Sequence, residues 1–223
     1  MAQTWTLGTK LLPGIDASKS ITIQCDRLAG ARISMPLPFG TATPPPQNAD
    51  TFLASKRIRI AHTAFDRDWA RVRNESLSRA TYTRLLGAAP GDKEATLLSV
   101  NRWVNRSIAY TEDRDLYGTA DFWAGARRTL KQRKGDCEDI ALLKMQMLAA
   151  AGIKREDMFL TIAKDLVRHA DHAVLIVRTA GTYRMLDNAS DEVIDAAPQS
   201  DYRAILSFSA GGTWLHGATV PVT

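Results

Sequence analysis

The spacing of hydrophobic and polar residues changes character along the chain. In residues 1–50, glycines and prolines interrupt every short apolar run, and residues 41–48 read as an extended loop. From about residue 51 to 86 the apolar positions recur with a helical period. After Gly152 the pattern becomes that of β-strands. The chain therefore predicts an irregular N-terminal extension, then helices, then a sheet.

Three further helices are expected before Gly152, covering about 92–108, 121–131 and 137–152. Asp92 is a suitable N-cap for the first of them. Its core face is formed by Leu97, Val100, Asn101, Val104 and Ile108. The last helix is expected to bury Leu142, Leu143, Met147 and Leu148. Met145 and Met147 are interpreted as core filling rather than as a ligand pair.

Four apolar runs predict strands: 158–163, 172–178, 182–186 and 204–208. The second and third flank Thr179-Ala180-Gly181, which is typical of a hairpin turn. Helices followed by an antiparallel sheet describe an α+β fold. We expect residues 51–223 to form a single domain.

The net charge of +5 comes from scattered lysines and arginines rather than from a charged tail. The densest clusters, Arg127-Arg128 and residues 131–134, lack the aromatic neighbours of a nucleic-acid site. They are interpreted as a solvated surface. No apolar run approaches the roughly 20 residues that span a bilayer. No signal peptide is recognisable, and Met1–Trp5 is equally compatible with a mature N-terminus, so export stays open.

Cys137 lies at the predicted start of a helix, where unpaired N–H groups and the helix dipole favour a thiolate. The thiolate is the reactive form of cysteine. The other cysteine is Cys25, and a disulfide between the two stays open. A catalytic Cys137 would have to be free, which would leave Cys25 as a small buried or loop thiol.

His172 and Asp187 complete a candidate catalytic set with Cys137. A hairpin folded about Ala180 places residue 172 opposite residue 188 or nearby, so His172 and Asp187 are expected to be cross-strand neighbours. Cys137 would attack a carbonyl, His172 would move the proton, and Asp187 would hold the imidazole tautomer. Each residue also has a structural interpretation: a buried thiol, a satisfied edge histidine, a turn-capping aspartate. Their joint order favours catalysis.

These residues resemble the bacterial transglutaminase-like cysteine proteinases, the LapG-type periplasmic adhesin proteases. The resemblance covers roughly residues 90–216. It rests on the segments Tyr110–Gly118, Asp121–Ala124, Gly135–Asp139, His172–Leu175 and Leu186–Asn188, together with Tyr202, Ser207 and Phe208. It implies a papain-like, transglutaminase-like core with Cys137, His172 and Asp187 as the catalytic triad.

The resemblance also implies two further features of the site. Trp123 would wall the cleft or polarise the scissile carbonyl, with a core anchor as the alternative. A calcium ion would bind near the nucleophile, and the available acids are Asp113, Asp115, Asp136, Glu138 and Asp139. Because Asp136 also fits an N-cap role, Asp139 with Asp113 or Asp115 is preferred over it. Acids beside a thiolate would raise its pKa, and a bound cation would offset that repulsion.

The function implied by the resemblance is a calcium-dependent periplasmic cysteine endopeptidase. It would cleave the N-terminal region of a large repeat-rich surface adhesin and release it during biofilm dispersal. Its regulator would be an inner-membrane cyclic-di-GMP receptor of the LapD type. Two alternatives stay open: an amidase or acyl-transferring transglutaminase with the same acyl-thioester intermediate, and a non-catalytic binding module on the same scaffold.

Overall fold

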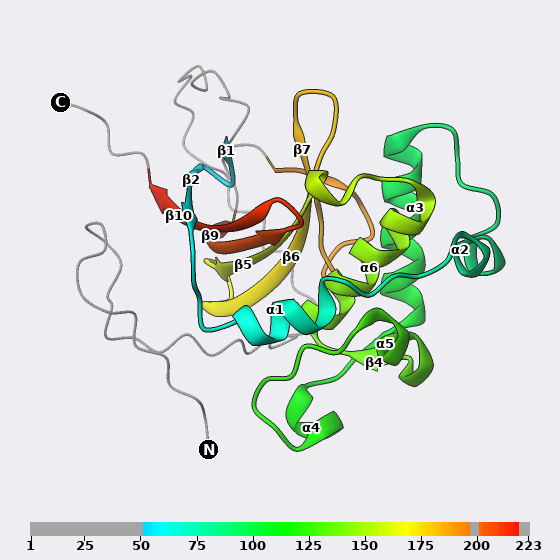
Figure 1. The fold of residues 1–223 in the computed structure, drawn as a ribbon, viewed down its shortest axis with the longest axis horizontal. Coiled ribbons are helices and arrows are strands. Elements are labelled where there is room, and N and C mark those ends of the chain that lie inside the picture. Colours follow the sequence, from blue (N-terminus) through cyan, green and yellow to red (C-terminus); the bar gives the residue numbers. More distant parts are fainter. Residues whose placement is uncertain (1–50, 197–200, 219–223) are drawn as a thin grey trace.

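The computed structural model describes residues 51–196 and 201–218. Its centre is an eight-stranded sheet with helices packed against it (Figure 1). The strand order is β1-β2-β10-β9-β5-β6-β7-β8, and every neighbouring pair is antiparallel. The predicted α+β fold, with helices packed on an antiparallel sheet, is confirmed. The expected irregular extension 1–50, including the segment 41–48 and Cys25, lies outside the described residues.

The elements have the following bounds. The helices are α1 (Asp66–Val72), α2 (Arg79–Leu86), α3 (Lys93–Ser107), α4 (Asp113–Tyr117), α5 (Ala126–Gln132) and α6 (Cys137–Ala151), with a short 3-10 helix η1 at Arg155–Asp157. The sheet strands are β1 (Thr51–Phe52), β2 (Ser55–Ile60), β5 (Met158–Asp165), β6 (Ala170–Arg178), β7 (Tyr183–Leu186), β8 (Ile194–Asp195), β9 (Tyr202–Ser209) and β10 (Gly212–Ala218). A separate parallel pair joins β3 (Ala109–Tyr110) to β4 (Lys134–Gly135).

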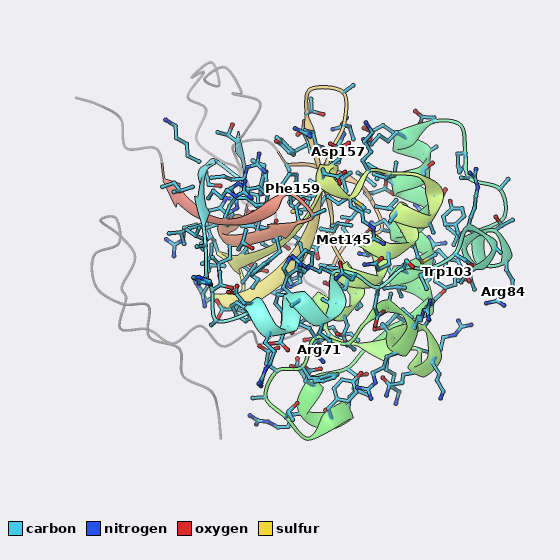
Figure 2. All side chains as sticks on the ribbon, in the orientation of Figure 1. Arg71, Arg84, Trp103, Met145, Asp157 and Phe159 are labelled. Atoms are coloured by element: carbon cyan, nitrogen blue, oxygen red, sulfur yellow. The ribbon has the colours of Figure 1, made fainter. Side chains whose placement is uncertain are left out.

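Helix α6 is the centre of the core. Every residue from Cys137 to Leu148 is buried, and the helix contacts β5 and β6 on the sheet as well as α2, α3 and α5. A helix that is enclosed on all sides has no need of a polar face, which fits a sequence in which only Glu138, Asp139, Lys144 and Gln146 are polar after Cys137. Figure 2 shows Met145 inside the molecule and Arg84 at its periphery. Met145 and Met147 fill the core, as predicted.

The helical prediction for residues 51–86 is wrong over its first ten residues. Residues 51–60 form β1 and β2, and β2 pairs with β10. Helices α1 and α2 follow. The helix expected at 121–131 begins only at Ala126, and α4 and β10 were not predicted. Helices α3 and α6 have the expected bounds to within a residue or two, with Asp92 as the N-cap of α3.

Two local pairings place the residues of the candidate site. The hairpin β6–β7 pairs Leu175 with Leu186, one residue away from the register expected, and Asp187 follows directly after the last pair. The β3–β4 pair places the acidic segment after Tyr110 beside the start of α6, and the N–H of Thr111 donates to the carbonyl of Gly135. Segments far apart in the sequence therefore meet at the N-terminal end of α6.

Candidate active site

Helix α6 begins at Cys137 because Asp136 caps it. The backbone of Asp136 is extended, and its carboxylate accepts the N–H of Asp139 at 3.4 Å. Gly135 precedes the cap, and a Cβ atom at this position would lie 2.7 Å from the Cβ of Asp139. The glycine is therefore required for the close approach of the chain to α6.

The sulfur of Cys137 lies at the junction of α6 and β6. It accepts the backbone N–H of Ala173 at 3.3 Å, and Oε2 of Glu138 lies 3.2 Å away. In this structure Cys137 is disulfide-bonded, and the described residues include no free cysteine. The sequence left a disulfide at Cys137 open, and nucleophilic chemistry at this residue requires its reduction.

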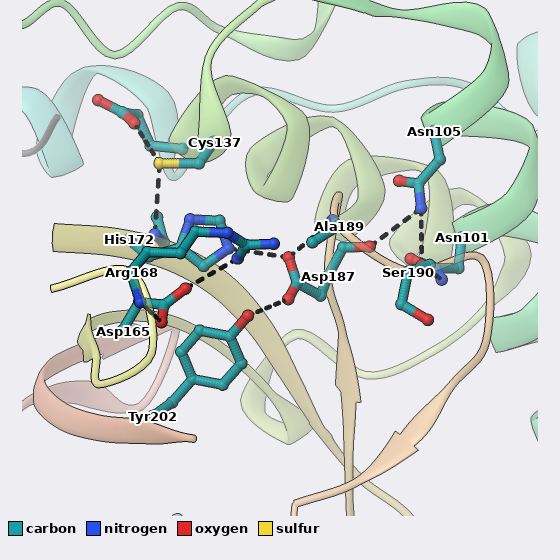
Figure 3. Close-up of polar contacts among 12 residues, drawn as sticks. Asn101, Asn105, Cys137, Asp165, Arg168, His172, Asp187, Ala189, Ser190 and Tyr202 are labelled. Atoms are coloured by element: carbon teal, nitrogen blue, oxygen red, sulfur yellow. Dashed lines mark hydrogen bonds and ion pairs between the residues drawn. The ribbon is translucent and has the colours of Figure 1, made fainter. Parts of the chain in front are cut away.

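His172 and Asp187 are joined by a buried hydrogen bond. Nε2 of His172 lies 2.8 Å from Oδ1 of Asp187, and their side chains are 8% and 2% exposed (Figure 3). The same oxygen accepts the N–H of Ala189 at 3.0 Å. Since Nε2 faces the carboxylate, Nδ1 is the ring nitrogen left for a neighbour such as Cys137. The structure thus brings the three predicted residues together.

The electrostatics of the pair favour an ionised Asp187. Burial opposes ionisation, but the charge of His172 and the hydrogen bonds from His172, Ala189 and Tyr202 outweigh it and hold the pKa of Asp187 well below its usual range. The backbone is fixed as well, because the side-chain amide of Asn105 donates to the carbonyl of Asp187 at 3.0 Å.

Acidic side chains cluster at the start of α6. Two sets have ligand oxygens within 4.8 Å of one another, and they share Asp113: Asp113, Asp121 and Glu138, and Asp113, Asp136 and Asp139. Four of the five predicted metal ligands therefore belong to one or both of these sets: Asp113, Asp136, Glu138 and Asp139. Asp121 was not predicted, because its position depends on the loop between α4 and α5.

Asp115 is the predicted ligand that the structure does not place in either set. It is exposed, whereas Asp113 is buried. Residues two apart in a helix project about 200° from one another, so a single turn cannot direct both Asp113 and Asp115 into the same site.

The second set fits a hard cation. One oxygen of Asp113 accepts the N–H of Phe122, and one oxygen of Asp139 accepts the N–H of Ala124 at 2.6 Å. The other oxygen of each carboxylate is buried without a hydrogen-bond partner among the described residues. Buried carboxylate oxygens without donors are costly unless a cation or a proton satisfies them. Calcium prefers such oxygen ligands.

The pKa values of the clustered acids reflect the same cost of burying carboxylates without a cation. Burial and mutual repulsion raise the pKa of Asp136 and Asp139 well above the usual range, and burial raises that of Asp113 to about 6. Burial, followed by the charges of the neighbouring acids, also raises the pKa of Glu138. Without a cation the cluster therefore favours bound protons.

Trp123 lies in the core. Its ring is fully buried, stacks on Phe65 at a centroid distance of 5.3 Å, and meets Phe208 edge-on. This placement matches the core-anchor alternative. The indole nitrogen is buried without a hydrogen-bond partner in the described part of the chain, and its role toward a substrate carbonyl stays a prediction.

Lys144 was missed by the sequence analysis, although a lysine two turns after Cys137 in an apolar run was a visible signal. Its side chain is buried. Burial lowers the pKa of Lys144 to about 7, against the attraction of Asp187 and Asp191. A buried lysine therefore lies within the electrostatic range of the acid of the candidate triad.

Lys144→Met is expected to remove a pH dependence of stability. Between pH 7 and about 10.5 the unfolded chain binds the proton and the folded chain does not, so the free energy of unfolding rises with pH, by at most about 1.4 kcal/mol per pH unit. Urea unfolding at pH 6, 8 and 9.5, with calcium in every sample, measures this slope. The exposed control Lys154→Met should keep the slope, and parallel curves for Lys144→Met and wild type would contradict the assignment.

Comparison with known proteins finds a family and solved structures that this chain resembles. Residues 60–216 match the family described as bacterial transglutaminase-like cysteine proteinase. The structure is similar to that of Legionella pneumophila LapG, with 25% sequence identity, a TM-score of 0.50, and coverage of 63% of this chain and 88% of that one.

Two further structures of the Legionella protein are similar. The EGTA-treated form has 25% identity and a TM-score of 0.50 over 63% of this chain and 86% of that one. The calcium-bound form has 24% identity and a TM-score of 0.48 over 62% and 88%. No curated protein sequence matches. On the family match, the chain belongs to the bacterial transglutaminase-like cysteine proteinases.

Proposed function

We propose that this protein is a calcium-dependent cysteine endopeptidase with Cys137, His172 and Asp187 as its catalytic triad. The observation that carries the proposal is the buried 2.8 Å contact between His172 and Asp187. Beside it, the sulfur of Cys137 accepts a hydrogen bond from the backbone N–H of the residue after His172. The three residues come from α6, β6 and the end of β7. They are suited to act as nucleophile, general base and orienting acid in acyl transfer through a thioester.

The reaction begins with reduced Cys137. Nδ1 of His172 takes the thiol proton, and the sulfur attacks the carbonyl carbon of the scissile amide. N–H groups at the start of α6 are suited to receive the resulting oxyanion. When the C–N bond breaks, the imidazolium gives its proton to the departing amine and an acyl-thioester is left on Cys137. Water, deprotonated by His172, then attacks the thioester, releasing the acid and restoring the thiol.

Calcium would be held by Asp113, Asp136 and Asp139, with Asp121 and Glu138 close by. A bound cation would neutralise carboxylates that otherwise repel the Cys137 thiolate and raise its pKa. The protein residues that move protons and form bonds are Cys137 and His172.

The resemblance to the family suggests a substrate and a regulator. We propose a large repeat-rich adhesin cut in its N-terminal region, and an inner-membrane cyclic-di-GMP receptor of the LapD type as the regulator, both encountered in the periplasm. In the described residues, no helix is both long and apolar enough to pass through a bilayer. The region 51–223 is proposed to act as one domain.

Cleavage of the adhesin tests the function. The reduced chain with calcium should cut a purified N-terminal adhesin fragment, and Cys137→Ala should leave it intact. Cys25→Ala, a change at the other cysteine, should retain cleavage. Failure of the wild type to cut, or cutting by Cys137→Ala, would overturn the proposal. Incorporation of an added amine into the fragment without cleavage would favour the transglutaminase alternative.

A further inference from the structure

Tyr202 makes two contacts with the candidate triad. Its hydroxyl donates to Oδ2 of Asp187 at 2.6 Å, and its ring stacks on the imidazole of His172 with centroids 5.6 Å apart and planes 25° apart (Figure 3). Tyr202 begins β9 and pairs with Asp165 at the end of β5. Its side chain therefore reaches across the end of β5 to the His172–Asp187 pair.

The hydroxyl satisfies the one carboxylate oxygen that His172 leaves. Oδ1 of Asp187 accepts from His172 and from the N–H of Ala189, while Oδ2 accepts from Tyr202. Donors on both oxygens fix the plane of a buried carboxylate, which then fixes the imidazole that it holds. Burial of the phenol, with the negative charge of Asp187, raises the pKa of Tyr202 far above its usual range, so the O–H remains a donor.

The turn between β5 and β6 supports the ring of Tyr202. The carboxylate of Asp165 accepts the backbone N–H groups of Val167 and Arg168 and pairs with the guanidinium of Arg168 at 2.8 Å. The charge of Arg168 also interacts with the phenol of Tyr202, and Figure 3 shows Arg168, Asp165 and Tyr202 in this region. An ordered turn at this position limits the directions in which the phenol and the imidazole can move.

We propose that Tyr202 is a positioning residue of the triad: its hydroxyl holds the Asp187 carboxylate and its ring holds the His172 imidazole with Nδ1 directed to Cys137. This inference rests on the proposed function, because it assigns Tyr202 a task in the same reaction. Tyr202 touches neither the substrate nor the attacking sulfur in this role, so it acts through His172 and Asp187.

Tyr202→Phe tests the hydroxyl while keeping the ring. The primary readout is the pH profile of alkylation of reduced Cys137 by iodoacetamide, which needs no substrate. We expect the alkylation rate at pH 6.5 to fall about tenfold, because the pH profile shifts to higher pH. For cleavage of the adhesin fragment, kcat should also fall about tenfold, while KM stays within twofold of the wild-type value. Tyr202→Leu, which also removes the stacking, should lose more.

Tyr183→Phe is the matched control, since Tyr183 is buried in β7 and its hydroxyl contacts Arg57 instead. It should leave the alkylation profile unchanged. A wild-type profile in Tyr202→Phe, or an equal shift in the control, would overturn the inference. Where Tyr202→Phe does not fold, 3-fluorotyrosine at position 202 makes the same O–H more acidic, and an unchanged profile would then refute the role.

The two readouts separate this inference from the proposed function. If Tyr202→Phe shifts the alkylation profile but the wild type cleaves no adhesin, the positioning role is retained and the proposed substrate is lost. A chain that cleaves normally with a wild-type alkylation profile in Tyr202→Phe would retain the function and lose the role of Tyr202.

Discussion

Asp187→Asn is expected to lower kcat/KM for cleavage of the adhesin fragment by about 10³–10⁴-fold, the scale of the corresponding loss in serine-protease triads. The amide keeps the shape of the carboxylate but loses the charge that attracts His172 at 2.8 Å. It also places an N–H₂ group where an acceptor is required, so the imidazole loses its preferred tautomer. Steady-state cleavage by the reduced, calcium-loaded protein measures the effect.

Asp191→Asn provides the matched control for this prediction. Asp191 lies four residues further along the same loop and pairs with Arg106 at the surface. Its substitution should change kcat/KM by less than twofold. Retention of more than a tenth of the wild-type activity in Asp187→Asn would exclude Asp187 from the triad.

Removal of calcium is expected to have the second large effect. At a calcium concentration 100 times Kd, binding adds about 2.7 kcal/mol to the free energy of unfolding, which raises Tm by about 5–10 °C for a chain of this size. The alkylation rate of reduced Cys137 should rise with calcium at the same midpoint. Thermal unfolding and alkylation of EGTA-treated protein, titrated with calcium, measure both effects.

The acidic cluster also predicts the sign of the pH dependence without calcium. Carboxyls with raised pKa values bind more protons in the folded state than in the unfolded state, so the free energy of unfolding falls as pH rises above about 4. Calcium should remove much of this decline. Asp113→Asn should abolish the calcium-induced rise in Tm, and Asp115→Asn, at an exposed position of the same helix, should not. Equal responses of the two variants would contradict the proposed ligands.

The central part of the fold could be predicted because its signals are local. From Ile140 onward the run is apolar except for Lys144 and Gln146, and it ends at Gly152, whose left-handed conformation caps α6. The hairpin β6–β7 likewise has two apolar strands and a glycine-containing turn, and this was enough to bring His172 near Asp187.

The edge of the sheet could not be predicted in the same way. Strand β2 has only six residues, of which the last four, 57–60, alternate basic and apolar side chains. Its partner β10 lies at the other end of the chain, where Ser55 pairs with Ala218. No local sequence pattern indicates a pairing between segments so far apart in the chain. Asp121 illustrates the same limit at the site, because its place beside Asp113 and Glu138 depends on the loop between α4 and α5.

The most direct test of the central claim is the pH dependence of Cys137 alkylation in reduced wild type and in His172→Ala, both with calcium. A thiol that pairs with His172 should alkylate rapidly down to about pH 6, because the imidazolium favours the thiolate. His172→Ala should move the midpoint toward the ordinary cysteine value of about 8.5 and lower the rate at pH 6 more than tenfold. Superimposable profiles would show that His172 does not activate the sulfur, and the proposed triad would be wrong.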